Sequence, residues 1–245
     1  KVKISSGGSL QFNQGITNVN SDLIEIKTTK PNSDISIDGL QVKGSSVPNN
    51  PDSARDINPN ALSAAIDSLQ VKSSSVPINL VSAGDLNLEL GGTDASTDAI
   101  ALSAYAAGDI TIQTFERDGV AADLRPVPSS GNPDALRSDN GTIVLNLAGG
   151  LDTSARSTDP NQSLITAQRI EISAATGSID NLVVDSSING LTSSSGVAVR
   201  TLGSDGNIAL TEATGDLQLI TPSSFSSDQS ISSSANVSLS VASGN

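Results

Sequence analysis

Short runs in which apolar and polar residues alternate recur along the whole chain. They include 7–12 (GGSLQF), 83–90 (AGDLNLEL), 107–114 (AGDITIQT) and 140–147 (NGTIVLNL). Alternation with a period of two is typical of β-strands that bury one face. Most of these runs follow Gly, Ala or Asn, and small residues suit a tight corner where φ is positive. The pattern predicts many short strands joined by sharp corners.

The strands belong to a repeated unit. Segment 38–48 (DGLQVKGSSVP) returns as 67–77 (DSLQVKSSSVP), 29 residues later, with two Gly-to-Ser changes. Segments 167–179, 205–217 and 234–245 align without gaps, and each holds a strand followed by a Gly. A unit of this size cannot bury its apolar face alone but does so when it stacks on its neighbours. We therefore expect an all-β fold, a parallel β-solenoid (β-helix) with irregular coil lengths.

Stacked coils should lay equivalent apolar residues over one another as ladders inside the tube. We expect residues 1–245 to form a single elongated domain, as a segment of a longer or processed chain. The predicted inward-facing ladder residues are Leu40, Val42, Leu69, Val71, Ile110, Ile112, Ile170, Ile172, Ile208, Leu210, Val237 and Leu239.

Polar inserts interrupt this pattern at 44–60, 125–140, 154–163 and 221–234. Most contain Pro, which cannot donate a hydrogen bond to a central ladder, so we expect these inserts to bulge from the corners. Segment 60–69 (NALSAAIDSL) has apolar residues at helical spacing, which leaves a helix as an alternative there. A β-sandwich is a further alternative, and it would have antiparallel strands.

The composition restricts both the kind of core that the fold can have and the kinds of partner that the chain can bind. Aromatic residues make up 2% of the chain, which suits a narrow core of stacked Leu, Ile and Val. The net charge is −13, and the 13 basic residues are scattered singly. Because phosphate backbones are bound by clustered Lys and Arg, we expect no nucleic-acid partner. No apolar run approaches the length of a membrane-spanning helix, so we expect no membrane insertion. The chain has no Cys, which excludes disulfides.

One segment is a candidate metal site. In 91–99 (GGTDASTDA), Asp94 and Asp98 lie in a turn-rich sequence, and carboxylate and carbonyl oxygens suit Ca²⁺. The alternative is that both Asp residues form turns by bonding nearby backbone N–H groups. We otherwise expect no cofactor.

Catalysis is the competing functional hypothesis. Acidic and basic residues cluster only in 115–126 (FERDGVAADLRP). The chain contains no His that could act as a general base and no G-x-S-x-G nucleophile motif. A solvated charged loop is the favoured interpretation of this segment, and we expect no catalytic residues. The alternative function is a carbohydrate-active β-helix enzyme, a polysaccharide lyase or hydrolase, which needs carboxylates facing each other across a groove.

The repeat resembles that of filamentous-haemagglutinin-type proteins, which include giant repeat-bearing bacterial surface adhesins. A small residue, then Gly, Asp or Asn, is followed by Ile/Leu-x-Ile/Leu and by Ala-x-x-Gly-x-Ile/Leu, most clearly in 167–179 and 205–217. Segments 83–90, 107–114 and 140–147 match less closely. The resemblance implies a right-handed parallel β-helix, secreted or at the cell surface and used for adhesion or display. The chain departs from the family in its irregular repeat spacing.

These observations predict a non-enzymatic extracellular structural protein: a surface stalk, an adhesin segment or a filament subunit. The open edges of a solenoid are templates for further strands. We therefore expect either end-to-end self-association or continuation of the same polypeptide. A host-cell or surface receptor, glycan or protein, is the expected external partner.

Overall fold

The structure is a computed structural model, and it describes most of the chain from residue 84 onward. The backbone is described at 2–6, 10–12, 24–28, 35–37, 63–64, 78–82, 84–91, 99–117, 120–128 and 133–243. Side chains are described at 80, 84–88, 99–116, 121–128 and 133–243.

Strands stack into two long sheets and one short one. The ten-stranded sheet has the order β2 (Leu10–Phe12), β4 (Ile35–Ile37), β5 (Ser63–Ala64), β7 (Leu86–Gly91), β9 (Ile110–Arg117), β13 (Thr142–Leu147), β15 (Arg169–Ala174), β17 (Gly196–Thr201) and β19 (Ile231–Ser232), with β10 (Val120–Ala121) attached to β9. The eight-stranded sheet contains β6 (Ile78–Ser82), β8 (Ile100–Ala106), β11 (Leu124–Pro126), β12 (Leu136–Ser138), β14 (Ile165–Thr166), β16 (Ile179–Asp185), β18 (Ile208–Glu212) and β20 (Val237–Val241). The two-stranded sheet contains β1 (Val2–Ser6) and β3 (Ile24–Thr28).

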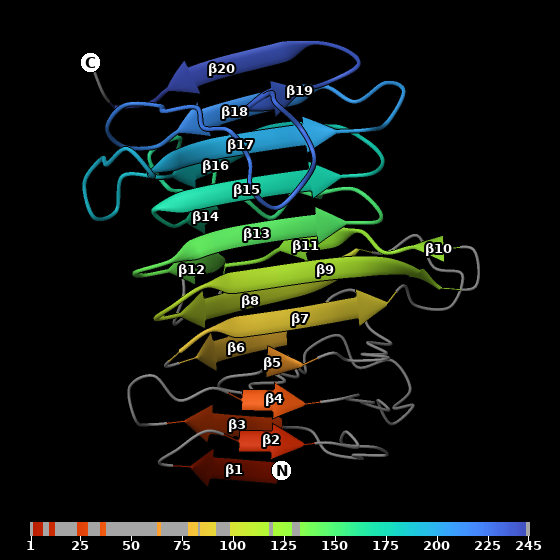
Figure 1. Cartoon of the computed structure of the whole chain (residues 1–245), viewed down its shortest axis with the longest axis vertical. Helices are drawn as coiled ribbons and strands as arrows, with labels where there is room; N and C mark the ends of the chain where they lie inside the picture. Colours follow the sequence, from red (N-terminus) through yellow and green to blue (C-terminus); the bar gives the residue numbers. More distant parts are fainter. Residues whose placement is uncertain are drawn as a thin grey trace.

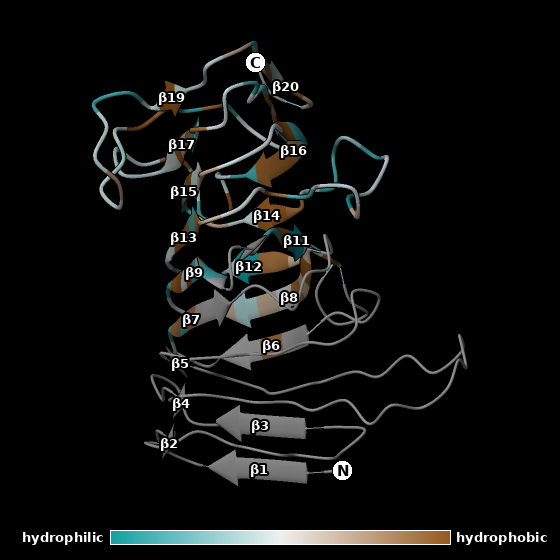
Figure 2. Cartoon of the chain, turned by 90° about the vertical axis from the view of Figure 1, so that its right-hand side faces the viewer, coloured by the Kyte–Doolittle hydropathy of each residue, from teal (hydrophilic) through white to brown (hydrophobic). Residues whose placement is uncertain are grey.

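From β6 to β20 the chain alternates between the two long sheets, so that each circuit adds one level to each sheet, with β11 and β12 sharing a level (Figure 1). Every pairing in these two sheets is parallel except that of β9 with β10. Five steps lead from β7 through β9, β13, β15 and β17 to β19, which makes about five turns. In the side view of Figure 2, the two long sheets form two facing columns with the core between them. The described residues thus form an all-β parallel β-solenoid, as predicted.

Two aliphatic ladders run along the inner face of the ten-stranded sheet. Each takes one residue from each of β7, β9, β13, β15 and β17, and none of these side chains is more than 2% exposed. The alternating sequence pattern produces this arrangement, because every second side chain of a strand points to the same face. The first ladder contains Leu86, Ile110, Ile143, Ile170 and Val197, and the second contains Leu88, Ile112, Leu145, Ile172 and Val199.

The eight-stranded sheet carries the matching ladders of the C-terminal coils. Ile208 pairs with Val237 and Leu210 with Leu239, in the predicted register. Their burial differs sharply, however. Ile208 and Leu210 are 1% exposed, whereas Val237 and Leu239 are 46% and 41% exposed. The prediction that these last two residues lie in the core is wrong, because no further strand of the described chain covers β20.

Polar rungs stack at the corners. The Asp85 carboxylate accepts a bond from the Asp109 amide (2.8 Å), and the Asp109 carboxylate accepts one from the Thr142 amide (2.7 Å). Gly141 allows this close stacking, since a Cβ on it would lie 2.7 Å from the carbonyl carbon of Gly108. At Gly141, contact between coils therefore requires the small residue, and φ there is not positive, whereas Gly177, just before β16, has a φ of +71°, as expected for a tight corner.

The inserts predicted at 125–140, 154–163 and 221–234 leave the tube from within a sheet, which corrects the prediction that they bulge from corners, whereas 186–195 connects β16 to β17 at a corner. β11 pairs with residues 100–102 of β8 and β12 with residues 104–106, so 127–135 is a detour between two halves of one strand level. Leu151 bridges to Leu124 and β14 pairs with β12, so 152–164 is a second such detour. The continuous strand of the adjacent coil aligns both halves, which is why the ladder survives the insertion.

Several expectations meet different outcomes. Ser63–Ala64 is strand, not helix, because it pairs with β4 and β7. Parallel pairing contradicts the β-sandwich. The ladder positions Leu40, Val42, Leu69 and Val71 lie outside the described residues. The right-handed sense of the solenoid stays a prediction.

Candidate functional site

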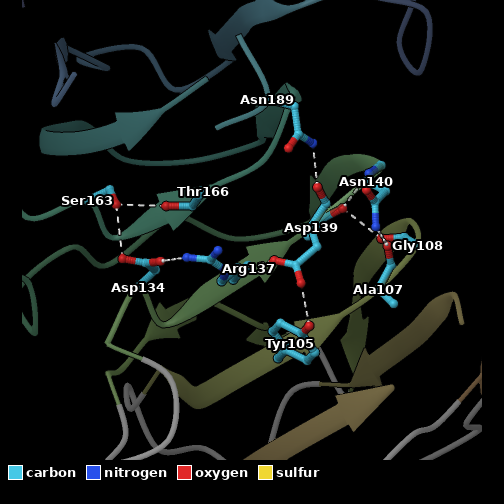
Figure 3. Close-up of polar contacts among 12 residues, drawn as sticks. Tyr105, Ala107, Gly108, Asp134, Arg137, Asp139, Asn140, Ser163, Thr166 and Asn189 are labelled. Atoms are coloured by element: carbon cyan, nitrogen blue, oxygen red, sulfur yellow. Dashed lines mark hydrogen bonds and ion pairs between the residues drawn. The ribbon is translucent and has the colours of Figure 1, made fainter. Parts of the chain in front are cut away.

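A polar cluster on the outside of the solenoid lies over the eight-stranded sheet, around Arg137 of β12 (Figure 3). Its guanidinium is bonded to the Asp139 carboxylate (Nε–Oδ1, 2.9 Å) and to the Asp134 carboxylate (Nη1–Oδ2, 2.9 Å). The Tyr105 hydroxyl of β8 donates to the second oxygen of Asp139. One cation is thus shared by two carboxylates, and one carboxylate is shared by a cation and a phenol.

The protonation states of this cluster are fixed by its own bonds. The hydrogen bond to Asp139, with burial, raises the pKa of Tyr105. Burial alone would raise the pKa of Asp139, but the bonds from Tyr105 and Arg137 outweigh it and lower that pKa. At neutral pH Tyr105 therefore stays protonated and Asp139 stays ionised. Neither group is placed to exchange a proton near neutrality, as general acid–base catalysis requires.

The cluster joins inserts from three successive coils. The Ser163 hydroxyl donates to Asp134 (3.1 Å), and the Gln162 amide donates to the carbonyl of Pro133 (3.4 Å). The Asn189 amide, 50 residues along the chain, donates to the Asp139 carbonyl (2.6 Å). We call the surface formed by 133–134, 152–164 and 186–195 the insert surface. Its loops are held in place by bonds between coils, while residues 189–194 are exposed to solvent.

A second feature covers the outer face of the ten-stranded sheet. Residues 220–230, here called the strap, detour between Leu219, which bridges to Val197, and β19. The buried Glu171 carboxylate of β15 accepts bonds from the amides of Ser223 (2.9 Å) and Ser224 (2.7 Å) and from both hydroxyls. These contacts fasten the strap to the sheet.

The bonds to Glu171 also set its acidity. Burial alone would raise the pKa of this carboxyl group, but the bonds from Ser224, Ser223 and Arg169 outweigh burial and lower the pKa to about 2. Arg169 contributes an ion pair at 2.5 Å. Glu171 is therefore ionised throughout the neutral range. Its carboxylate accepts the hydrogen bonds that hold the strap on the sheet.

Apolar contact completes the strap. Phe225 packs with Ile220 and Ala198 in a small cluster separate from the main core. The guanidinium of Arg200 lies 4.4 Å from the centre of the Phe225 ring, in cation–π geometry. Arg200 also donates to the Ser226 carbonyl (3.2 Å). The strap is thus packed on the sheet through Ile220 and Phe225, while Asp228 and Gln229 are exposed.

Glu212 is a buried carboxyl group with a pKa near neutrality. Burial raises its pKa to about 7, although the Ser186 amide and hydroxyl donate to its two oxygens at 2.8 Å. A carboxyl group in that range suits proton transfer. The side chain is fully buried, however, at the end of the inward row of Ile208 and Leu210. Because Glu212 has no contact with solvent in the folded state, its ionisation affects the stability of the fold.

The charged segment 115–126 is part of the solenoid wall. β9 ends at Arg117 and pairs with β10 as a short hairpin, where a solvated loop was expected. The Asp123 carboxylate accepts a bond from the Gly150 amide (2.5 Å). Arg125 lies 4.0 Å from Asp152. These described contacts join neighbouring coils and do not bring carboxylates together across a groove.

The predicted calcium ligands, Asp94 and Asp98, lie outside the described residues. Among the residues that are described, no group of three or more acidic side chains converges where a metal ion could bind. In the same part of the chain, no helix has the length and apolarity of a membrane span.

Sequence reasoning missed Glu171 and Glu212, for different reasons. Glu212 follows Leu210 by two residues, as Leu210 follows Ile208, so the alternating pattern alone could have placed its side chain on the inner face. Glu171 lies between Ile170 and Ile172 and reads as an ordinary outward polar position. Its partner Arg169 is two residues away, but its Ser partners, Ser223 and Ser224, are about 50 residues away, and no local pattern connects them to it.

Comparison with known proteins adds no family. No family model matches this chain, and searches of curated proteins and of solved structures return no match. The fold therefore stands on the structure, and the adhesin resemblance rests on the repeat pattern.

Proposed function

We propose that this chain is a non-enzymatic extracellular structural protein whose solenoid displays the insert surface for adhesion. The observation that carries the proposal is that inserts from three successive coils are bonded to one another through Asp134, Asp139 and Asn189. A rigid scaffold that holds several loops in fixed positions provides a contact surface at low entropic cost.

Composition and repeat pattern support the same proposal. The acidic, Ser-rich chain has no Cys and relies on main-chain ladders for its stability. The repeat resembles that of secreted adhesins, which favours a location outside a bacterial cell. The described polar cluster pairs its charges internally, which favours display over proton-transfer chemistry. The partner class that fits is a surface glycan or protein receptor.

A binding assay tests the proposal. The labelled 245-residue chain is applied to a glycan array and to intact host cells, beside Leu191→Asp and a matched control, Leu202→Asp. Leu191 is an exposed residue of the insert surface, and Leu202 is exposed at a corner outside it. We expect Leu191→Asp to reduce binding at least about tenfold and Leu202→Asp to leave it unchanged.

Two results would overturn the proposal. One is the absence of binding to every glycan and cell tested, or equal binding by both variants. The other is release of reducing ends or unsaturated sugars from polysaccharides by the purified chain, which would establish the carbohydrate-active enzyme instead.

A further inference from the structure

The last described strand, β20, has an open edge. The Asn236 carbonyl accepts a bond from Ile208 (2.9 Å), and the Ala242 amide donates to Glu212 (2.8 Å), so these groups face β18. Because main-chain groups of successive residues point to opposite sides of a strand, those of Val237, Leu239 and Val241 face the open edge. β20 can therefore accept another parallel strand without losing a bond to β18.

The same strand is apolar and uncovered. Val237, Leu239 and Val241 are 46%, 41% and 40% exposed. One coil below, Ile208 and Leu210 occupy the same register positions and are 1% exposed. The difference between the two coils is the covering of one further coil, so a strand added to β20 would remove apolar surface from water.

The first described strand, β1, has the matching pattern and direction. β1 pairs in parallel with β3, Val2 with Ile24 and Ile4 with Ile26, so its second edge is turned away from the stack. β1 and β20 lie at opposite ends of the molecule and run in the same direction (Figure 1). A copy placed on the end of another would thus bring β1 onto β20 as a parallel pair.

The two ends also carry opposite charges. Residues 1–20 contain Lys1 and Lys3 and no acidic residue. Residues 201–245 contain no basic residue and four acidic ones, of which Asp205, Asp216 and Asp228 are exposed and Glu212 is buried. Complementary charge favours head-to-tail contact over contact between like ends.

We propose that a second copy of this chain stacks its β1 on β20, with Val2 opposite Val237 and Ile4 opposite Leu239. The contact joins different surfaces of the two copies, so it repeats from copy to copy and lengthens the rod. The inference deepens the proposed function, on which it rests for its biological purpose, because a longer rod presents many insert surfaces.

Sedimentation velocity tests the contact between copies. Three samples are compared: the 245-residue chain, the variant Leu239→Lys and the matched control Leu191→Lys. Leu191 and Leu239 are both 41% exposed, and Leu191 lies on the insert surface, away from β20. We expect the wild-type chain and Leu191→Lys to associate as concentration rises. Lys on an edge strand opposes pairing, so Leu239→Lys should raise the dissociation constant at least about tenfold. Electron micrographs should show rods that grow in length and not in width.

A second variant addresses charge. Lys3→Gln removes a positive charge from the end that meets the acidic end, without placing an acid opposite Glu25 of β3. This variant should weaken association at low salt, with a smaller effect at high salt. Circular dichroism and melting temperature establish that each variant is folded. A chain that stays monomeric at every concentration, or variants at residues 3 and 239 that associate as the wild type does, would overturn the inference.

Failure of this inference and failure of the proposed function are distinguishable. Adhesion is measured at concentrations where the chain is monomeric. A chain that adheres but never associates removes the stacking contact alone, and a chain that associates but binds no surface removes the adhesive function alone.

Discussion

Two buried glutamates show how far the surroundings decide the properties of a residue. Glu171 and Glu212 are both fully buried, yet the pKa of the first is about 2 and that of the second about 7. Glu171 accepts bonds from two Ser residues and an Arg, which stabilise its charged form. Glu212 has one Ser partner, too few to offset burial. The number of donors therefore decides which form is stable.

At this scale the ladder residues make the clearest stability prediction. Ile170→Asp places an unpaired charge in a fully buried ladder and should lower the free energy of unfolding by on the order of 4 kcal/mol. Ser193→Asp, on the exposed part of the insert surface, should change it by less than about 0.5 kcal/mol. Urea denaturation of both variants measures the difference, and equal effects would contradict the inward placement of Ile170.

Elements of this fold tolerate interruption because each strand is templated by the coil beside it. β8 aligns both β11 and β12, and β17 aligns Leu219 and β19 on either side of the strap. Insertions therefore accumulate within sheet levels without breaking the ladders. Their conformations then depend on contacts along the rod, such as those of Asn189 and Glu171.

The attachment of the strap to the ten-stranded sheet can be tested by removing the charge of Glu171. Glu171→Gln removes the charge that accepts bonds from the amides and hydroxyls of Ser223 and Ser224, so the strap should detach while the ladders persist. Limited proteolysis should then cut within 220–230 at least about tenfold faster than in the wild type. Asp228→Asn, an exposed acid in the same strap, is the matched control. Unchanged cleavage of Glu171→Gln would show that the apolar contacts of Phe225 suffice.

The whole molecule should respond to pH through both glutamates. For Glu171 the folded pKa of about 2 lies below the reference value of 4.5, so its stabilisation is complete above 4.5 and is lost toward pH 2. For Glu212 the folded pKa of about 7 lies above 4.5, so its stabilisation is complete below 4.5 and is lost as pH rises through 7. Both contributions are complete near pH 4.5.

We therefore expect stability to be greatest in the mildly acidic range and to fall toward neutrality. Urea midpoints measured from about pH 3 to about pH 8 test this. Glu212→Gln should flatten the fall between 4.5 and 7, because the amide cannot ionise. Glu171→Gln should leave that fall unchanged and reduce the loss on the acid side. A wild-type profile that rises toward neutrality would contradict the burial of an uncompensated carboxyl group.

Alternation and repetition in the sequence were enough to determine the local and nearest-neighbour features of this protein. They predicted parallel stacking and the register of Ile208 with Val237, because strand period and coil stacking depend on residues close in sequence or one repeat apart. Within the described residues, they also identified the buried ladder at Ile110, Ile112, Ile170 and Ile172.

Only the tertiary structure decided the features that depend on contacts between residues far apart in the sequence. It placed the inserts within sheet levels, bonded Asn189 to Asp139, covered Glu171 with the strap and left Val237 and Leu239 exposed. These outcomes depend on which coils are neighbours and on what covers a given face. A pattern of single residues specifies the direction of a side chain but not the distant group that meets it.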